Sequence, residues 1–61
     1  MKNKFEIEFL NSYGHVIYNF CYECKTEKQA ITKAKKEKTE LYPDCAWIEI
    51  LNLDTMKRIY A

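Results

Sequence analysis

The chain has 61 residues, 48% of them hydrophobic, with one glycine and one proline. This composition is typical of one folded domain, because disordered chains are poorer in aromatic and β-branched residues. The formal net charge of +1 excludes both an acidic mimic of nucleic acid and a strongly basic nucleic-acid coat. A domain this short is near the lower limit at which a core alone offsets chain entropy, so a partner or second copy would add useful stability.

Residues 4–22 predict a first β-hairpin. Apolar and polar side chains alternate over residues 5–9, which is the period of a half-buried strand. Gly14 suits the turn, because glycine readily adopts the left-handed backbone that closes a short loop. A four-residue loop then sets Phe9 opposite Val16, with apolar side chains on one face of the hairpin and polar ones mainly on the other.

Residues 26–42 predict a helix with clear signals at both ends. Thr26 followed by Gln29 fits a capping box, and Pro43 ends the helix because the residue before a proline avoids the helical conformation. A period of 3.6 residues then predicts an apolar stripe that faces the sheet. The stripe consists of Ala30, Ile31, Ala34 and Leu41. Its two central alanines would let the helix lie close to a sheet crowded with aromatic rings.

Residues 45–60 predict a second hairpin. Pairing Asn52 with Lys57 sets Ile50 opposite Ile59 under the helix, and it favours a left-handed backbone at Met56.

Together these segments predict an α+β fold, a single compact ββαββ domain over residues 1–61. We expect a four-stranded, mainly antiparallel sheet with one helix packed on one face. The longest apolar runs are far shorter than the roughly 20 residues that cross a bilayer, and the first residues lack the apolar block of a signal peptide. We therefore expect a cytoplasmic protein that does not bind a membrane.

The three cysteines and the single histidine offer the only candidate metal or redox chemistry. Cys21 and Cys24 have the C-x-x-C spacing, and Cys45 and His15 would complete four zinc ligands. His15 and Cys21 would lie roughly 20 Å apart along a strand at about 3.3 Å per residue. Cys24 and Cys45 would fall at opposite ends of the sheet.

A redox dithiol at the C-x-x-C sequence is the sharper enzymatic alternative, since thioredoxin-like proteins place such a pair between a strand and a helix. Here the helix cap at Thr26 follows both cysteines, and no base and orienting acid can be named beside a nucleophile. An odd cysteine count is typical of free thiols in a reducing compartment. We therefore expect no enzyme activity, no metal, no cofactor and no small-molecule substrate.

The helix-free face of the sheet is the main candidate for function. Alternation places on it an apolar and aromatic group with one arginine: Trp47, Leu51, Tyr60, Ile17 and Arg58. Clusters rich in tryptophan, tyrosine and arginine mark protein interfaces more often than bare surface. We therefore expect a small protein–protein interaction module that self-associates, as a homodimer, or docks on a protein partner. A phage or mobile-element inhibitor of a host protein is one specific form of this expectation.

Nucleic-acid binding by the lysine-rich helix is the alternative. The exposed side of the predicted helix carries Lys28, Lys33 and Lys36, which could lie along phosphates. The interleaved Glu37 and Glu40 are instead typical of a solvated helix face. Salt separates the two hypotheses, because phosphate binding weakens steeply with ionic strength whereas an apolar interface hardly changes.

Overall fold

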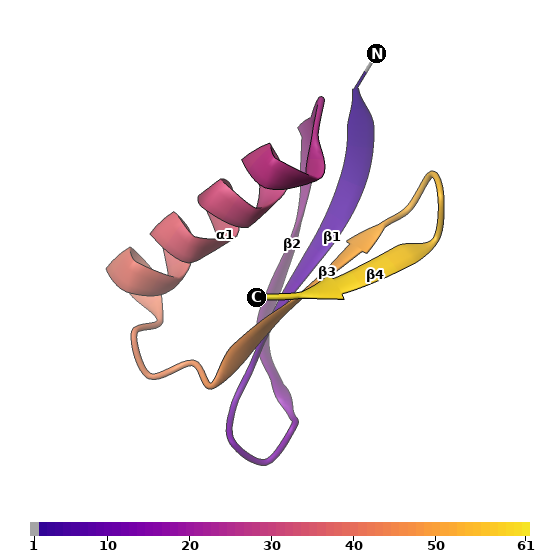
Figure 1. The fold of residues 1–61 in the computed structure, drawn as a ribbon. Helices are drawn as coiled ribbons and strands as arrows, with labels where there is room; N and C mark the ends of the chain where they lie inside the picture. The colour runs from indigo at the N-terminus through magenta and orange to yellow at the C-terminus, as the bar shows by residue number, and fades with distance from the viewer. Residues whose placement is uncertain (1) are drawn as a thin grey trace.

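The computed structural model describes residues 2–61, and Met1 lies outside the described residues. The elements are β1 (Asn3–Leu10), β2 (Val16–Cys24), α1 (Glu27–Leu41), β3 (Trp47–Asn52) and β4 (Lys57–Tyr60). The strands form one open sheet in the order β2-β1-β3-β4, and every neighbouring pair is antiparallel (Figure 1). The predicted α+β ββαββ fold is therefore confirmed. The strand order, which the sequence left open, makes β2 and β4 the edges.

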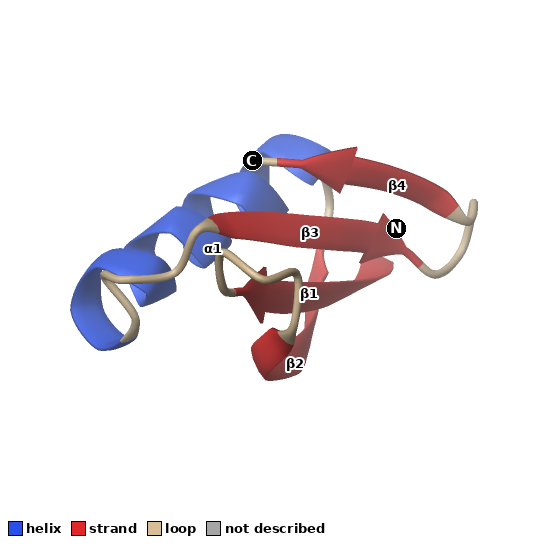
Figure 2. Cartoon of the chain, turned by 90° about the horizontal axis from the view of Figure 1, so that it is seen from below, coloured by secondary structure: helices blue, strands red, loops and turns tan. Residues whose placement is uncertain are grey.

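Helix α1 lies on one face of this sheet, and the other face carries no helix (Figures 1 and 2). The predicted capping box is present, with the Thr26 side chain accepting from the Gln29 N–H. Ala30 and Ala34 are fully buried against the sheet, as their place in the apolar stripe predicts. The prediction that Leu41 belongs to this stripe is wrong, because Leu41 is 57% exposed. Its neighbour Tyr42 turns toward the sheet instead and stacks on Tyr18, with the ring centroids 4.9 Å apart.

The core lies between α1 and the covered face of the sheet. Its largest fully buried side chains come from the two central strands, namely Phe5, Ile7, Phe9, Ile48 and Ile50. Phe9 is the centre of an aromatic cluster, with ring centroids 5.8 Å from Tyr18, 5.9 Å from Phe20 and 5.8 Å from Tyr42. Tilted and edge-to-face pairs at such distances stabilise beyond the burial of area.

The register predicted for the first hairpin is wrong. Phe9 lies opposite Tyr18 rather than Val16, because the pairing shifts between Phe9 and Leu10 and leaves Ile17 as an extra residue in β2. The loop is accordingly one residue longer than predicted, and the Asn11 N–H donates to the carbonyl of His15 at 2.9 Å. A shift of two residues keeps the aromatic side chains of β2 on the helix side, since side chains alternate with period two.

The second hairpin follows the prediction in every pair. Asn52 faces Lys57 and Ile50 faces Ile59. Met56 takes the left-handed conformation with φ 60°. The buried Asn52 side chain explains the turn, because its Oδ1 accepts the N–H groups of Asp54 and Thr55 at 2.9 and 3.2 Å. An asparagine that accepts hydrogen bonds from the backbone two and three residues later holds the start of the turn in place.

Candidate functional site

The helix-free face of the sheet, which we call the open face, combines acidic and apolar side chains. Alternation from the buried core positions places on it Lys4, Glu6, Glu8, Leu10, Asn19, Cys21, Glu23, Trp47, Glu49, Leu51, Arg58 and Tyr60. Glu8 lies directly opposite Glu49, and Glu6 lies opposite Leu51. The face therefore carries four carboxylates against two basic side chains.

The residues predicted to bind a protein fall into two groups rather than one patch. Leu51 pairs with Arg58, and Tyr60 pairs with Glu49, so these neighbours lie together on β3 and β4. Ile17 belongs to the opposite edge strand, with β1 and β3 between it and β4. Ile17 follows Val16, which pairs with Leu10 of β1, and Leu10 pairs on its other side with Trp47 of β3.

Exposure also differs among these residues. Tyr60 and Ile17 are 65% and 43% exposed, whereas the Trp47 and Leu51 side chains are half-buried by their neighbours. The acidic row of Glu8 and Glu49 lies between Trp47 and Leu51 along the strand direction. The tryptophan is therefore an apolar anchor at the border of an acidic area, not the centre of an apolar one.

One ion pair orders the middle of the open face. The Arg58 Nε donates to Glu49 Oε1 at 2.7 Å, and the carboxylate of Glu49 is the less exposed partner. Within residues 2–61, no ion pair forms with Glu6 or Glu8. Two carboxylates therefore remain available to a basic group from outside.

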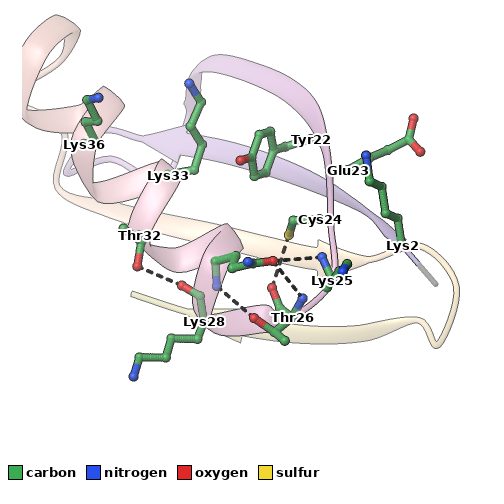
Figure 3. Close-up of a pocket in the computed structure, with 11 residues that line it drawn as sticks. Lys2, Tyr22, Glu23, Cys24, Lys25, Thr26, Lys28, Thr32, Lys33 and Lys36 are labelled. Carbon is green, nitrogen blue, oxygen red and sulfur yellow. Dashed lines mark hydrogen bonds between the residues drawn. The ribbon is translucent and has the colours of Figure 1, made fainter.

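A second candidate site lies on the helix side, between the N-terminal part of α1 and the end of β2. It is a hollow of about 690 Å³, which we call the lysine-lined hollow (Figure 3). Its lining consists of Lys2, Tyr22, Glu23, Cys24, Lys25, Thr26, Lys28, Gln29, Thr32, Lys33 and Lys36. All three lysines predicted for nucleic-acid binding thus line one hollow. Sequence reasoning missed Lys25, which lies just before the helix cap, and Lys2, which precedes β1 and meets the helix only in the folded chain.

Lys33 is held in place within the hollow. Its Nζ lies 2.8 Å from Glu37 Oε1 and 5.8 Å from the centroid of the Tyr22 ring. The hydrogen bond and the charge of Glu37 raise the pKa of Lys33 above its ordinary value. In Figure 3 Lys33 extends toward Tyr22, whereas Lys28 points away from the ring. The hollow therefore has one fixed ammonium group and several lysines at its rim.

The cysteines lie apart from one another in the fold. Strand β2 extends through Cys24, so Cys21 and Cys24 both lie on it, and an odd spacing on a strand sends them to opposite faces. Cys21 is exposed, whereas Cys24 and Cys45 are buried free thiols. Cys24 pairs with Asn3 at the start of β1. Cys45 lies near the end of β1, because it comes two residues before Trp47, which pairs with Leu10.

The buried thiols are engaged in local hydrogen bonds. Cys24 Sγ lies 3.2 Å from the Thr26 carbonyl oxygen, and Cys45 Sγ lies 3.0 Å from that of Trp47. Across the part of the chain that the structure describes, no group of three side chains is arranged to hold a metal ion. His15 is exposed at the end of the first hairpin loop.

Comparison with protein-family models, curated proteins and solved structures finds no match to this chain. None of the helical residues in the described range 2–61 forms a segment long and apolar enough to span a membrane.

Proposed function

We propose that this protein is a small non-enzymatic binding module that docks through its open face on a basic surface of a protein partner. The observation that carries the proposal is the combination on that face of a half-buried Trp47 with two carboxylates, Glu6 and Glu8, that form no ion pair within residues 2–61. Complementary charge steers association and selects partners, and aromatic residues provide most of the affinity at interface centres. A phage or mobile-element factor that occludes a host protein, in the cytoplasm, fits this role.

The residues of the open face have different roles in this proposal. Trp47 supplies the anchor together with Leu51, whereas Tyr60 is the exposed ring at the border of the site. Glu6 and Glu8 meet basic groups of the partner. Arg58 holds Glu49 in place through their 2.7 Å contact and thereby lowers the repulsion between neighbouring carboxylates.

Partner capture by single variants tests the proposal. Trp47→Ala should keep the fold but weaken capture from a host lysate by tenfold or more, since interface anchors commonly contribute about 2 kcal/mol. The double variant Glu6→Gln, Glu8→Gln should weaken capture mainly at low salt. The matched control on the opposite side, Lys28→Ala with Lys36→Ala, should leave capture unchanged. Loss of capture in the lysine variant alone would overturn the proposal, and unfolding of Trp47→Ala would place that ring in the core.

A specific observation favours a second candidate function, binding of a polyanion such as single-stranded nucleic acid. Five lysines and one acidic residue, Glu23, line the hollow beside the ring of Tyr22, and Glu37 pairs with one of these lysines, Lys33. Single-stranded nucleic acid is commonly bound by a positive groove together with aromatic side chains on which bases stack.

Fluorescence anisotropy with labelled single-stranded DNA and RNA tests this second function. Lys28→Ala with Lys36→Ala should weaken binding of any sequence and flatten its dependence on salt, because fewer counterions are released. Trp47→Ala is the control on the other face and should bind equally well. Absence of salt-dependent binding in the unmodified protein would reject the candidate.

A further inference from the structure

The two edges of the sheet differ in length and charge. Strand β4 has four residues, two of them basic, Lys57 and Arg58. Strand β2 has nine residues with a single charge, Glu23, and contains no lysine or proline. Short strands, lysines and prolines are the usual means by which proteins prevent an edge strand from pairing with another chain. By this criterion β4 is protected and β2 is not.

The register shows which backbone groups of β2 face outward. The Leu53 N–H donates to the Lys4 carbonyl at 2.8 Å, so Lys4 and every second residue after it in β1 bond to β3. The intervening residues of β1 therefore bond to β2, where they meet Tyr22, Phe20 and Tyr18. By alternation, the N–H and C=O groups that point away from the sheet are those of Asn19, Cys21 and Glu23.

These outward groups are symmetric about Cys21. The irregularity at Ile17 interrupts β2 near its start and leaves residues 18–24 as the regular part of the strand, with Cys21 at the middle. An antiparallel copy of the same segment would thus find its hydrogen-bonding groups matched residue for residue. No backbone hydrogen bond from another element reaches this outer edge in the range 2–61.

We propose that two copies of this chain pair β2 with β2, antiparallel about a two-fold axis at Cys21, into one continuous sheet. Cys21 then faces Cys21 of the second copy, and Asn19 faces Glu23 of the second copy on either side. Each of these pairs exchanges two backbone hydrogen bonds, as hydrogen-bonded antiparallel pairs do. A two-fold contact of this kind is self-complementary and closes after two copies.

Charge and packing support a second copy as the occupant of this edge. The single charge of β2 lies near its end, so antiparallel pairing separates the two glutamates and sets each carboxylate beside an asparagine amide. On the helix side, the half-buried rings of Phe20 and Tyr22 become cross-strand neighbours. The two-fold axis also puts both helices on the same face of the combined sheet, with one lysine-lined hollow on each side of the β2–β2 contact.

Sedimentation equilibrium of three proteins tests the pairing: the unmodified chain, Cys21→Ser and Cys21→Pro. Proline lacks the outward N–H, which β1 does not use, whereas serine keeps it and loses only the thiol. We expect dimers of the unmodified chain and of Cys21→Ser, and a dissociation constant at least tenfold higher for Cys21→Pro with unchanged circular dichroism. A monomeric unmodified chain at high micromolar concentration, or an undisturbed dimer of folded Cys21→Pro, would overturn the proposal.

Cross-linking provides a second measurement that does not depend on the folding of the proline variant. Hydrogen-bonded antiparallel pairs have Cα atoms about 5.5 Å apart, so a short bis-maleimide should join two copies through Cys21 and should fail with Cys21→Ser. Absence of that product from the unmodified protein would contradict the register. Trp47→Ala should remain dimeric, so failure of β2 pairing and failure of partner docking on the open face give separate results.

Discussion

The two faces of the sheet are built by the same strands, yet they differ in almost every physical property. On the covered face Phe5, Ile7 and Ile50 are fully excluded from solvent by the helix. On the open face Trp47 is half-buried, beside carboxylates that face water. Five lysines line the hollow on the helix side, whereas the open face carries Glu6, Glu8 and Glu49, so the net charge of +1 is unevenly distributed over the surface. The covered face therefore contains the core, and the open face is the more exposed of the two.

The largest loss of stability is expected at the aromatic cluster of the covered face. Phe9→Ala should destabilise the protein by about 3–5 kcal/mol, because it removes a fully buried ring that contacts three others and leaves a cavity. In a domain of this size such a loss approaches the whole free energy of unfolding. Urea denaturation followed by circular dichroism measures it.

The matched control is a ring on the open face. Tyr60→Ala removes a side chain that is 65% exposed and should change the free energy of unfolding by less than about 1 kcal/mol. Equal losses for the two variants would mean that the open face is part of the core.

A smaller effect is expected on the buried side of the helix. Ala34→Leu should destabilise by about 1–3 kcal/mol, because a fully buried position offers no room for three more carbons. Lys36→Leu, two residues further on the exposed side, should be nearly neutral. Thermal melts that rank the two variants in the reverse order would show that the phase of the helix is wrong.

Local sequence patterns were enough to predict the start of the helix and the pairing of the second hairpin. The capping box at Thr26 and Gln29 fixes the start of the helix, and the turn held by Asn52 fixes the second hairpin. The first hairpin was predicted but its register was not, because an extra residue at Ile17 changes the pairing without changing which face is apolar. A pattern of period two carries no information about a shift of two residues.

The candidate sites were harder to predict than the fold, because they depend on strand order. Ile17 and Tyr60 are both exposed, as predicted. Alternation cannot show, however, that they lie on opposite edge strands with β1 and β3 between them. It also cannot show that Lys2, which precedes β1, joins the lysines of the helix around one hollow. Contacts between distant segments decide both outcomes, and no local pattern encodes them.

On the open face, one carboxylate should cost stability rather than add it. Glu8 lies directly opposite Glu49, and like charges in that arrangement repel. Glu8→Gln should therefore stabilise the fold by about 0.2–1 kcal/mol at low salt, with the gain shrinking as salt screens the repulsion. Thermal melts at two ionic strengths measure it, with Glu40→Gln on the exposed side of the helix as the control. A destabilised Glu8→Gln would mean that the carboxylate has a favourable contact in solution.

The smallest effect concerns the fixed lysine of the hollow. The hydrogen bond and negative charge of Glu37 raise the pKa of Lys33, so the pair favours the folded state while that lysine stays protonated and loses this contribution as pH rises through the raised pKa, above the ordinary 10.5. NMR titration of the lysine side chains should therefore show the pKa of Lys33 above the ordinary 10.5. Glu37→Gln should return the pKa of Lys33 toward this ordinary value, because it removes the charge and keeps the side-chain length. An unchanged titration in Glu37→Gln would mean that the ion pair does not persist in solution, and the ammonium group over Tyr22 would then be as mobile as the lysines at the rim.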